Sequence, residues 1–238
     1  MDIMAHRGNS AYCPENTMAS FRGAVEAAAD FIELDVRLSK DGIPVVCHDA
    51  TIKRTSNGKA FIHELTVDEL KKYDFGSWFS SDFKGERIPT FEEVLQLVQH
   101  EPIRLNIETK NGPDMPMNLE VNTLELVYKY NMQDRVMYSS FDHFSLKRLY
   151  ELDQSAKIGF IFHMNLINLF DYIANTGVPT YSIHPNHFYI TEDMITKAHQ
   201  RGIKVNAYTV NNRQWAEQYR NMGVDGLITN FPAEMKAL

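Results

Sequence analysis

The sequence is poor in cysteine and in long apolar runs, and each shortage argues against a class of protein. Cys13 and Cys47 are its two cysteines, too few for a disulfide framework and typical of thiols that stay reduced inside the cell. No run of about twenty apolar residues occurs, so the sequence predicts no membrane-spanning helix. The first residues lead directly to His6, which leaves no room for a signal peptide. We therefore expect a cytoplasmic protein without stable membrane insertion.

The chain also has fewer basic residues than acidic ones. The chain has 24 Lys and Arg residues against 31 Asp and Glu residues, a formal charge of -7 at pH 7. Proteins that bind nucleic acid normally carry a basic patch that neutralises phosphates, so a nucleic-acid partner is not expected. An anionic substrate must instead be bound by local cations or by a metal ion. We expect a small-molecule partner, and nothing in the sequence indicates an oligomeric state.

Length and patterning predict the fold. The 238 residues are 44% hydrophobic, enough for one large core, and we expect a single domain over 1–238. Short β-rich apolar runs alternate with amphipathic segments, which indicates an α/β fold and a (β/α)8 TIM barrel. An open doubly wound sheet is the alternative. The expected strands are 3–6, 31–35, 104–108, 136–139, 157–162, 180–183, 204–208 and 226–229, and the expected helices are 17–29, 90–100, 119–130, 144–152, 167–175, 191–201 and 213–222.

One region interrupts this alternation. Residues 51–89 contain a short helical pattern at 67–73 and their own aromatic residues, among them Phe75, Trp78 and Phe79. The segment is too long for an ordinary loop between a strand and a helix. We interpret it as a small ordered insertion after the second strand. Because it begins beside His48 and barrel sites are built from loops at the strand ends, we expect it to form a wall or rim of the site.

Acidic residues occur in two strands with a spacing of two. Glu33 and Asp35 share one face of the second strand, as do Glu108 and Lys110 of the third, because alternate side chains of a strand point the same way. Three carboxylates and a lysine can therefore converge. Oxygen ligands in this number suit a hard cation such as Mg2+ or Ca2+. The alternative is a solvated strand edge, with Lys110 merely paired to Glu108.

Two histidines accompany these acids. His6 begins His6-Arg7-Gly8 and His48 precedes Asp49, and histidine is the side chain that moves protons near neutral pH. His6, followed by Arg-Gly, could be a turn residue, but the joint occurrence of these residues at successive strand ends favours a hydrolytic site. The other histidines are interpreted as surface or packing residues, although His184 and His187 follow a predicted strand closely enough to reach the mouth of the site.

A series of short motifs follows a characteristic order: His6-Arg7-Gly8, Pro14-Glu15-Asn16-Thr17, Glu33-Leu34-Asp35, His48-Asp49, Arg54-Thr55, Gly85-Glu86-Arg87-Ile88-Pro89-Thr90, Asn106-Ile107-Glu108-Thr109-Lys110 and Tyr208-Thr209-Val210-Asn211. With these motifs the chain resembles the glycerophosphodiester phosphodiesterase family over essentially its full length. The resemblance implies a barrel with this insertion, a divalent metal ion, and cleavage of glycerophosphodiesters to sn-glycerol 3-phosphate and an alcohol. It further implies metal ligands at Glu33, Asp35 and Glu108, an acid and a base at His6 and His48, and phosphate-binding cations at Arg7 and Lys110.

Two positions depart from the family pattern. Tyr208 stands where the family usually has tryptophan, and Asn230 stands where it usually has aspartate. We expect Tyr208 to contact the glycerol carbons, and its hydroxyl needs a partner if it is buried. Asn230 removes a negative charge from the barrel rim. Both departures concern substrate preference rather than the proposed metal ligands.

Several mechanisms and functions stay open. We expect the glycerol 2-hydroxyl to attack the phosphorus and form a cyclic phosphate that water then opens, with the histidines exchanging roles; direct attack by water is the rival. Alternative functions are a phospholipase-type enzyme of the same barrel superfamily, a metal hydrolase with a non-phosphate substrate, or an inactive barrel that binds phosphate or polyol.

Overall fold

Eight parallel strands form a closed barrel in the computed structural model, which describes residues 1–111 and 118–238. Each strand pairs with the next, and β1 pairs with both β2 and β9, which closes the ring. The predicted TIM barrel is therefore confirmed, and the open sheet is excluded. The barrel strands are β1 (Asp2–His6), β2 (Phe31–Leu38), β4 (Arg104–Thr109), β5 (Val136–Ser140), β6 (Ile158–Phe162), β7 (Ser182–Pro185), β8 (Lys204–Ala207) and β9 (Gly226–Thr229).

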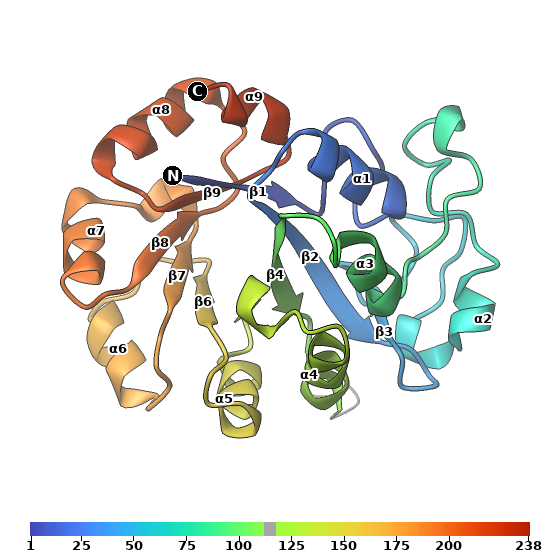
Figure 1. The fold of residues 1–238 in the computed structure, drawn as a ribbon, viewed down its shortest axis with the longest axis horizontal. Helices are drawn as coiled ribbons and strands as arrows, with labels where there is room; N and C mark the ends of the chain where they lie inside the picture. The colour runs from blue at the N-terminus through green and yellow to red at the C-terminus, as the bar shows by residue number, and fades with distance from the viewer. Residues whose placement is uncertain (112–117) are drawn as a thin grey trace.

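Helices surround the strands (Figure 1). Each presents apolar residues to the barrel, such as Phe91 and Leu95 of α3, which are fully buried. The predicted helices are present, and a further short helix, α9, follows the last strand. The described helices around the barrel are α1 (Met18–Glu26), α3 (Phe91–Val98), α4 (Leu119–Lys129), α5 (His143–Leu152), α6 (Leu169–Asn175), α7 (Glu192–His199), α8 (Arg213–Met222) and α9 (Pro232–Lys236), with single 3-10 turns η3 (Gln133–Arg135) and η4 (His187–Tyr189).

The segment between β2 and α3 contains an element that sequence patterning did not predict. Strand β3 (Pro44–Val46) runs antiparallel to β2 and pairs Val36 with Val46. It is only three residues long and begins with proline, a residue confined to strand edges and ends. The chain then passes through η1 (Ile62–Glu64), α2 (Val67–Leu70) and η2 (Ser81–Phe83) before it reaches α3 (Figure 1). A separate apolar cluster that includes Ile52, Leu70 and Phe75 holds this segment together.

Two strand ends differ from the prediction in ways that affect the site. β2 continues to Leu38 because its second half pairs with β3. β7 lies two residues later than predicted and ends at Pro185, so His184 is part of the strand and fully buried inside the barrel. In register, His184 pairs with Ile161 on β6.

The barrel interior changes character along its axis. Met4, Phe31, Met137 and Ile228 form an apolar cluster inside the ring. Polar side chains such as His6 follow in the direction of the strand carboxyl ends, where barrel enzymes bind their substrates. Among the described residues, no helix combines the length and apolar character needed to cross a membrane.

Candidate active site

Three buried carboxylates meet near the carboxyl ends of β2 and β4. The register pairs Asp35 with Glu108, and Glu33 lies two residues before Asp35 on the same inner face. One oxygen from each of the three side chains lies within 4.8 Å of the others. All three residues are buried. Oxygen donors in this number and at this spacing suit a hard divalent cation.

Two basic side chains lie against these acids. Lys110 Nζ is 3.0 Å from Asp35 Oδ1, and it also donates to Glu108. Arg7 Nε is 3.5 Å from Asp35 Oδ2, and the main-chain N–H of Arg7 donates to Glu33 Oε2 over 2.9 Å. The cations that the sequence singled out for phosphate binding therefore border the acidic cluster.

The three carboxylates differ in their electrostatics. Burial, followed by the charge of Asp35, raises the pKa of Glu33 well above its ordinary value. Burial also raises the pKa of Glu108, to about 7. Burial acts in the same direction on Asp35, but Lys110 and Arg7 outweigh it and lower the pKa of that carboxyl. The cluster thus holds more acidic groups than its two cations neutralise, a condition that favours a further cation.

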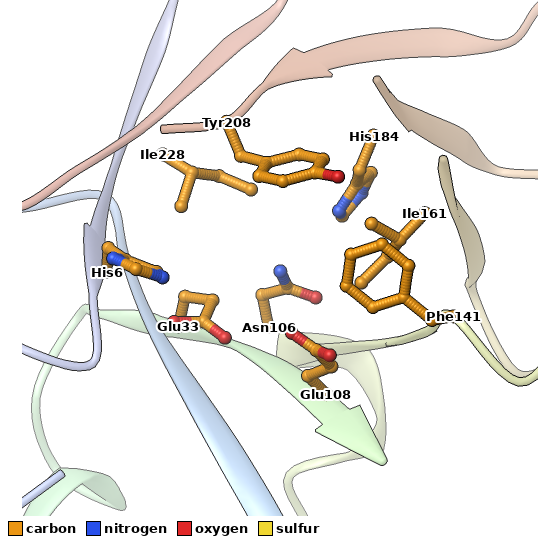
Figure 2. A pocket seen from close by; sticks show the side chains of 9 residues that line it. All are labelled: His6, Glu33, Asn106, Glu108, Phe141, Ile161, His184, Tyr208 and Ile228. Carbon is orange, nitrogen blue, oxygen red and sulfur yellow. The ribbon is translucent and has the colours of Figure 1, made fainter. Parts of the chain in front are cut away.

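His6 ends β1 and pairs in register with Glu33. Its Nδ1 lies 2.7 Å from Oδ1 of Asn230, the residue that follows β9. Because an amide oxygen only accepts, Nδ1 carries the ring proton and leaves Nε2 as an acceptor. The ring points into the pocket (Figure 2). Burial, followed by the charge of Arg7, lowers the pKa of His6 to about 4, so the imidazole is neutral at pH 7.

His48 follows β3 at the edge of the site. Its Nδ1 lies 2.7 Å from Asp49 Oδ1, and 33% of its side chain is exposed. Burial lowers the pKa of His48 against the opposing charge of Asp35. The position of His48 is held through its backbone, because Arg37 Nη2 donates to the His48 carbonyl over 2.7 Å.

Arg54 connects the insertion to both parts of the site. Its guanidinium donates to Glu15 and to Asp49. Glu15 also accepts from Arg7 Nη1 over 2.7 Å, while Asp49 is the partner of His48. The Arg54 side chain therefore contacts both the carboxylate that pairs with a predicted phosphate-binding residue and the carboxylate that pairs with a predicted catalytic histidine.

A pocket opens beside the acidic cluster (Figure 2). On its far side the Tyr208 hydroxyl donates to the Phe162 carbonyl over 3.0 Å, so this hydroxyl has the partner that its burial requires. The ring of Phe141 meets Tyr208 edge-on, with centroids 6.0 Å apart. The lining consists of His6, Glu33, Asn106, Glu108, Phe141, Ile161, His184, Tyr208 and Ile228.

The residues singled out from the sequence fall into two groups. Those that line this pocket are His6, Glu33, Glu108 and Tyr208. Four others lie beside the pocket: Arg7, Asp35, His48 and Lys110. Ion pairs join Arg7, Asp35 and Lys110 to the acidic cluster, and His48 is joined to Arg54 through Asp49.

Sequence reasoning missed several residues of the site. Asn106 lies two residues before Glu108 on β4, so the alternation that identified Glu108 would also have identified Asn106. His184 was interpreted as a surface or packing residue that could reach the mouth of the site, because the predicted strand ended one residue before it. Phe141 follows β5 without a sequence signal of its own. The contact of Asn230 with His6 joins residues 224 positions apart, which no local pattern indicates.

Known proteins are similar to this chain in both sequence and architecture. The family model described as glycerophosphoryl diester phosphodiesterase matches residues 6–234. A glycerophosphodiester phosphodiesterase of Caldanaerobacter subterraneus is 39% identical over 230 residues, which cover 97% of this chain and 94% of the relative. A putative glycerophosphodiester phosphodiesterase of Bacillus subtilis is 38% identical over 237 residues, covering 98% and 95%.

A solved structure extends this likeness to three dimensions. An Oleispira antarctica phosphodiesterase, determined in complex with the product sn-glycerol-3-phosphate, superimposes with a TM-score of 0.94. The two chains are 28% identical, and the match covers 100% of this chain and 96% of that one. The likeness therefore includes the insertion as well as the barrel.

Proposed function

This chain is an enzyme of the glycerophosphoryl diester phosphodiesterase family, and we propose that it hydrolyses glycerophosphodiesters to sn-glycerol 3-phosphate and an alcohol in a metal-dependent reaction. The observation that carries this proposal is the convergence of Glu33, Asp35 and Glu108 within 4.8 Å, bordered by two cations and by the neutral imidazole of His6. Each of these groups has a task in the hydrolysis of a phosphodiester. The substrate is a small molecule, and a cytoplasmic location is part of the proposal.

Glu33, Asp35 and Glu108 are the residues that would hold the metal ion. Hard carboxylate oxygens favour Mg2+ or Ca2+ over softer metals. Burial, followed for Glu33 by the charge of Asp35, raises the pKa of Glu33 and Glu108, and a bound cation would stabilise their charged forms. When bound, a divalent ion neutralises charge on the phosphate and stabilises the additional charge of the transition state.

Arg7 and Lys110 supply the remaining positive charge. Both contact Asp35, so the two cations are already directed at the acidic cluster before substrate arrives. A phosphodiester resists attack because its anionic oxygens repel nucleophiles. Fixed cations beside these oxygens lower that barrier without reorganisation during the reaction.

His6 and His48 move the protons. One imidazole takes the proton of the attacking hydroxyl, and the other donates a proton to the oxygen of the departing alcohol. The attacking group is the 2-hydroxyl of glycerol, which gives a cyclic phosphate; the histidines then exchange roles while water opens the ring. Nε2 of His6 is free to accept a proton, because the ring proton is on Nδ1 and is donated to Asn230.

Tyr208 and Phe141 bind the glycerol arm. Their rings form one side of the pocket (Figure 2), and the bond from the Tyr208 hydroxyl to Phe162 fixes its ring. Apolar ring surface suits the carbon atoms of glycerol. The departing alcohol then lies away from these rings.

The decisive experiment measures release of sn-glycerol 3-phosphate from a panel of glycerophosphodiesters, with and without chelator. We expect release from glycerophosphocholine or glycerophosphoethanolamine, loss of release in excess chelator, and recovery on adding Mg2+ or Ca2+. Absence of release from every glycerophosphodiester in the presence of metal would overturn the proposed function.

A further inference from the structure

Two buried polar side chains at the inner end of the pocket lack partners within the protein. Asn106 is 1% exposed and His184 is fully buried. In the described part of the chain, neither the amide nitrogen nor the amide oxygen of Asn106 has a hydrogen-bond partner, and neither does Nδ1 of His184. Both residues line the pocket: Asn106 lies between the acidic side chains and Tyr208, and His184 lies beside Tyr208 and Ile161 (Figure 2).

Unpaired polar groups in the interior are costly. A buried donor or acceptor without a partner costs about 1–3 kcal/mol, and most such groups in folded proteins are paired. Neither residue is among the groups that bind the metal ion, hold the phosphate or move protons in the proposed reaction. Both residues line the pocket, and this position indicates that a ligand supplies the missing partners.

The hydrogen bonds of His184 within the protein show which ring nitrogen is left to bind a ligand. Its Nε2 lies 2.9 Å from Ser182 Oγ and 3.1 Å from Asn206 Nδ2. An amide nitrogen only donates, so Nε2 accepts and Nδ1 carries the proton. Burial lowers the pKa of His184 to about 3, so the ring is neutral at pH 7. His184 therefore presents one N–H donor, and Asn106 presents both a donor and an acceptor.

The barrel leaves room for the His184 ring by using glycine on the neighbouring strand. A Cβ atom on Gly159 would lie 2.8 Å from His184 Nε2 and 2.8 Å from Ser182 Oγ, closer than side chains tolerate. Ile161 and Ile228 form apolar walls beside the two polar groups. Among the described residues, those that line this pocket include no lysine or arginine. Polar groups without a cation, set between apolar walls, suit a neutral hydroxyl on a short carbon chain rather than a second anion.

We propose that Asn106 and His184 bind the terminal hydroxyl of the glycerol arm and thereby select glycerol over other short alcohols on that side of the phosphate. A hydroxyl oxygen accepts from Nδ1–H of His184 while its hydrogen is donated to Asn106 Oδ1. Ile161, Ile228 and the Tyr208 ring contact the carbon atoms. This inference rests on the proposed function, because it assigns the part of the pocket that recognises the retained glycerol.

Two chromogenic diesters test this assignment. Glyceryl 4-nitrophenyl phosphate carries both glycerol hydroxyls, whereas 2-hydroxypropyl 4-nitrophenyl phosphate keeps the attacking 2-hydroxyl and lacks only the terminal one. We expect the wild-type enzyme to prefer the glyceryl ester in kcat/KM by at least roughly tenfold, the usual result of one lost hydrogen bond to a buried group. Asn106→Leu should lose most of this preference, because its kcat/KM falls much more on the glyceryl ester than on the hydroxypropyl ester.

Controls separate recognition from general damage. Asn106→Ala should behave like Asn106→Leu, because both remove the amide and only leucine fills its space. Asn221→Leu changes an exposed position of α8 and should keep the wild-type preference. Because Asn106 has no internal partner, we expect the melting temperature of Asn106→Leu to equal or exceed that of the wild type. A lower melting temperature with equal losses on both esters would mean that Asn106 is structural and would overturn the inference.

Failure of this inference is distinguishable from failure of the proposed function. If the wild-type enzyme cleaves both esters with similar kcat/KM, the enzyme is active but Asn106 and His184 do not recognise the terminal hydroxyl. If it cleaves neither ester nor any natural glycerophosphodiester, the proposed function itself is wrong and the inference falls with it. As a measurement independent of turnover, sn-glycerol 3-phosphate should inhibit the wild type more strongly than 2-hydroxypropyl phosphate, and this difference should vanish in Asn106→Leu.

Discussion

Arg54 donates two hydrogen bonds to Glu15, of 2.7 Å from Nη1 and 2.8 Å from Nη2, although 39 positions separate the two residues in the sequence. The same guanidinium donates to Asp49 from Nε over 2.8 Å. Glu15 in turn accepts from Arg7, and Asp49 accepts from His48. The insertion thus supplies one cation that holds the partners of both a proposed phosphate-binding residue and a proposed catalytic histidine.

We predict that Arg54→Ala lowers kcat by roughly ten- to a hundredfold, as is usual for residues that orient catalytic groups without touching substrate. Arg54→Lys should be almost as impaired, because a single ammonium cannot replace the planar fork that contacts two carboxylates. Added guanidinium ion should partly restore Arg54→Ala and leave Arg54→Lys unchanged. Arg213→Ala, which removes an exposed pair with Glu217 on α8, is the control. Full activity of Arg54→Ala would refute the role assigned to Arg54.

The second prediction concerns the two histidines. His6→Ala and His48→Ala should each lower kcat by roughly 10²- to 10⁴-fold, the usual contribution of a general acid or base, with much smaller changes in KM and melting temperature. His100→Ala, at an exposed position, should leave kcat unchanged. A 4-nitrophenyl leaving group departs without protonation, so the variant that lacks the acid should recover most of its activity on that ester. Recovery of neither variant would contradict the division into one acid and one base.

The third prediction concerns the metal ion. Chelation should abolish turnover and lower the melting temperature, because a ligand that binds only the folded state at a hundred times its Kd contributes about 2.7 kcal/mol to stability. Glu33→Gln keeps the shape of the side chain and removes its charge, so calorimetry should show weaker binding of Mg2+ or Ca2+ by a folded protein. Glu125→Gln, an exposed change on α4, should bind metal as the wild type does. Unaltered metal binding by Glu33→Gln would show that the ligand set is wrong.

The fourth prediction concerns pH. The pKa of His184 is about 3 in the folded protein and about 6.5 in an unfolded chain, so between these values the unfolded state binds a proton that the folded state does not. Stability therefore falls as the pH drops below 6.5. Relative to His184→Phe, the wild type should lose roughly 2 kcal/mol in free energy of unfolding between pH 8 and pH 5.

Urea unfolding in the presence of chelator at both pH values measures this shift. The raised pKa of Glu108 acts in the opposite direction, because its stabilising proton is lost as the pH rises through about 7. This contribution is common to both proteins and cancels in the difference. A difference that does not vary with pH would show that His184 is not held neutral by burial.

The fifth prediction tests the route of phosphoryl transfer. If the glycerol 2-hydroxyl attacks, the reaction is intramolecular and benefits from a large effective concentration. The 2-deoxy analogue of glycerophosphocholine should then bind as a competitive inhibitor and be cleaved poorly. A cyclic phosphate should appear transiently by 31P NMR in a slow variant such as His48→Ala. Efficient hydrolysis of the deoxy analogue would favour direct attack by water.

Local patterning was enough to predict the barrel and the acidic cluster. Strand and helix periods repeat within a few residues, so alternating segments along the chain predict the parallel ring. The same period of two placed Glu33 with Asp35, and Glu108 with Lys110, on shared faces. The three-residue strand β3 was missed because so short a run, opened by Pro44, carries no periodic signal.

The sequence by itself therefore determined the barrel, the identity of the acidic residues and their common face, because these depend on neighbours along the chain. Only the tertiary structure decided which residues meet across the ring. Closure of β1 between β2 and β9 brings Asn230 to His6, and the register of β7 with β6 and β8 buries His184 beside Asn206. Such contacts join distant segments, and their geometry follows from strand register and barrel closure rather than from any local pattern.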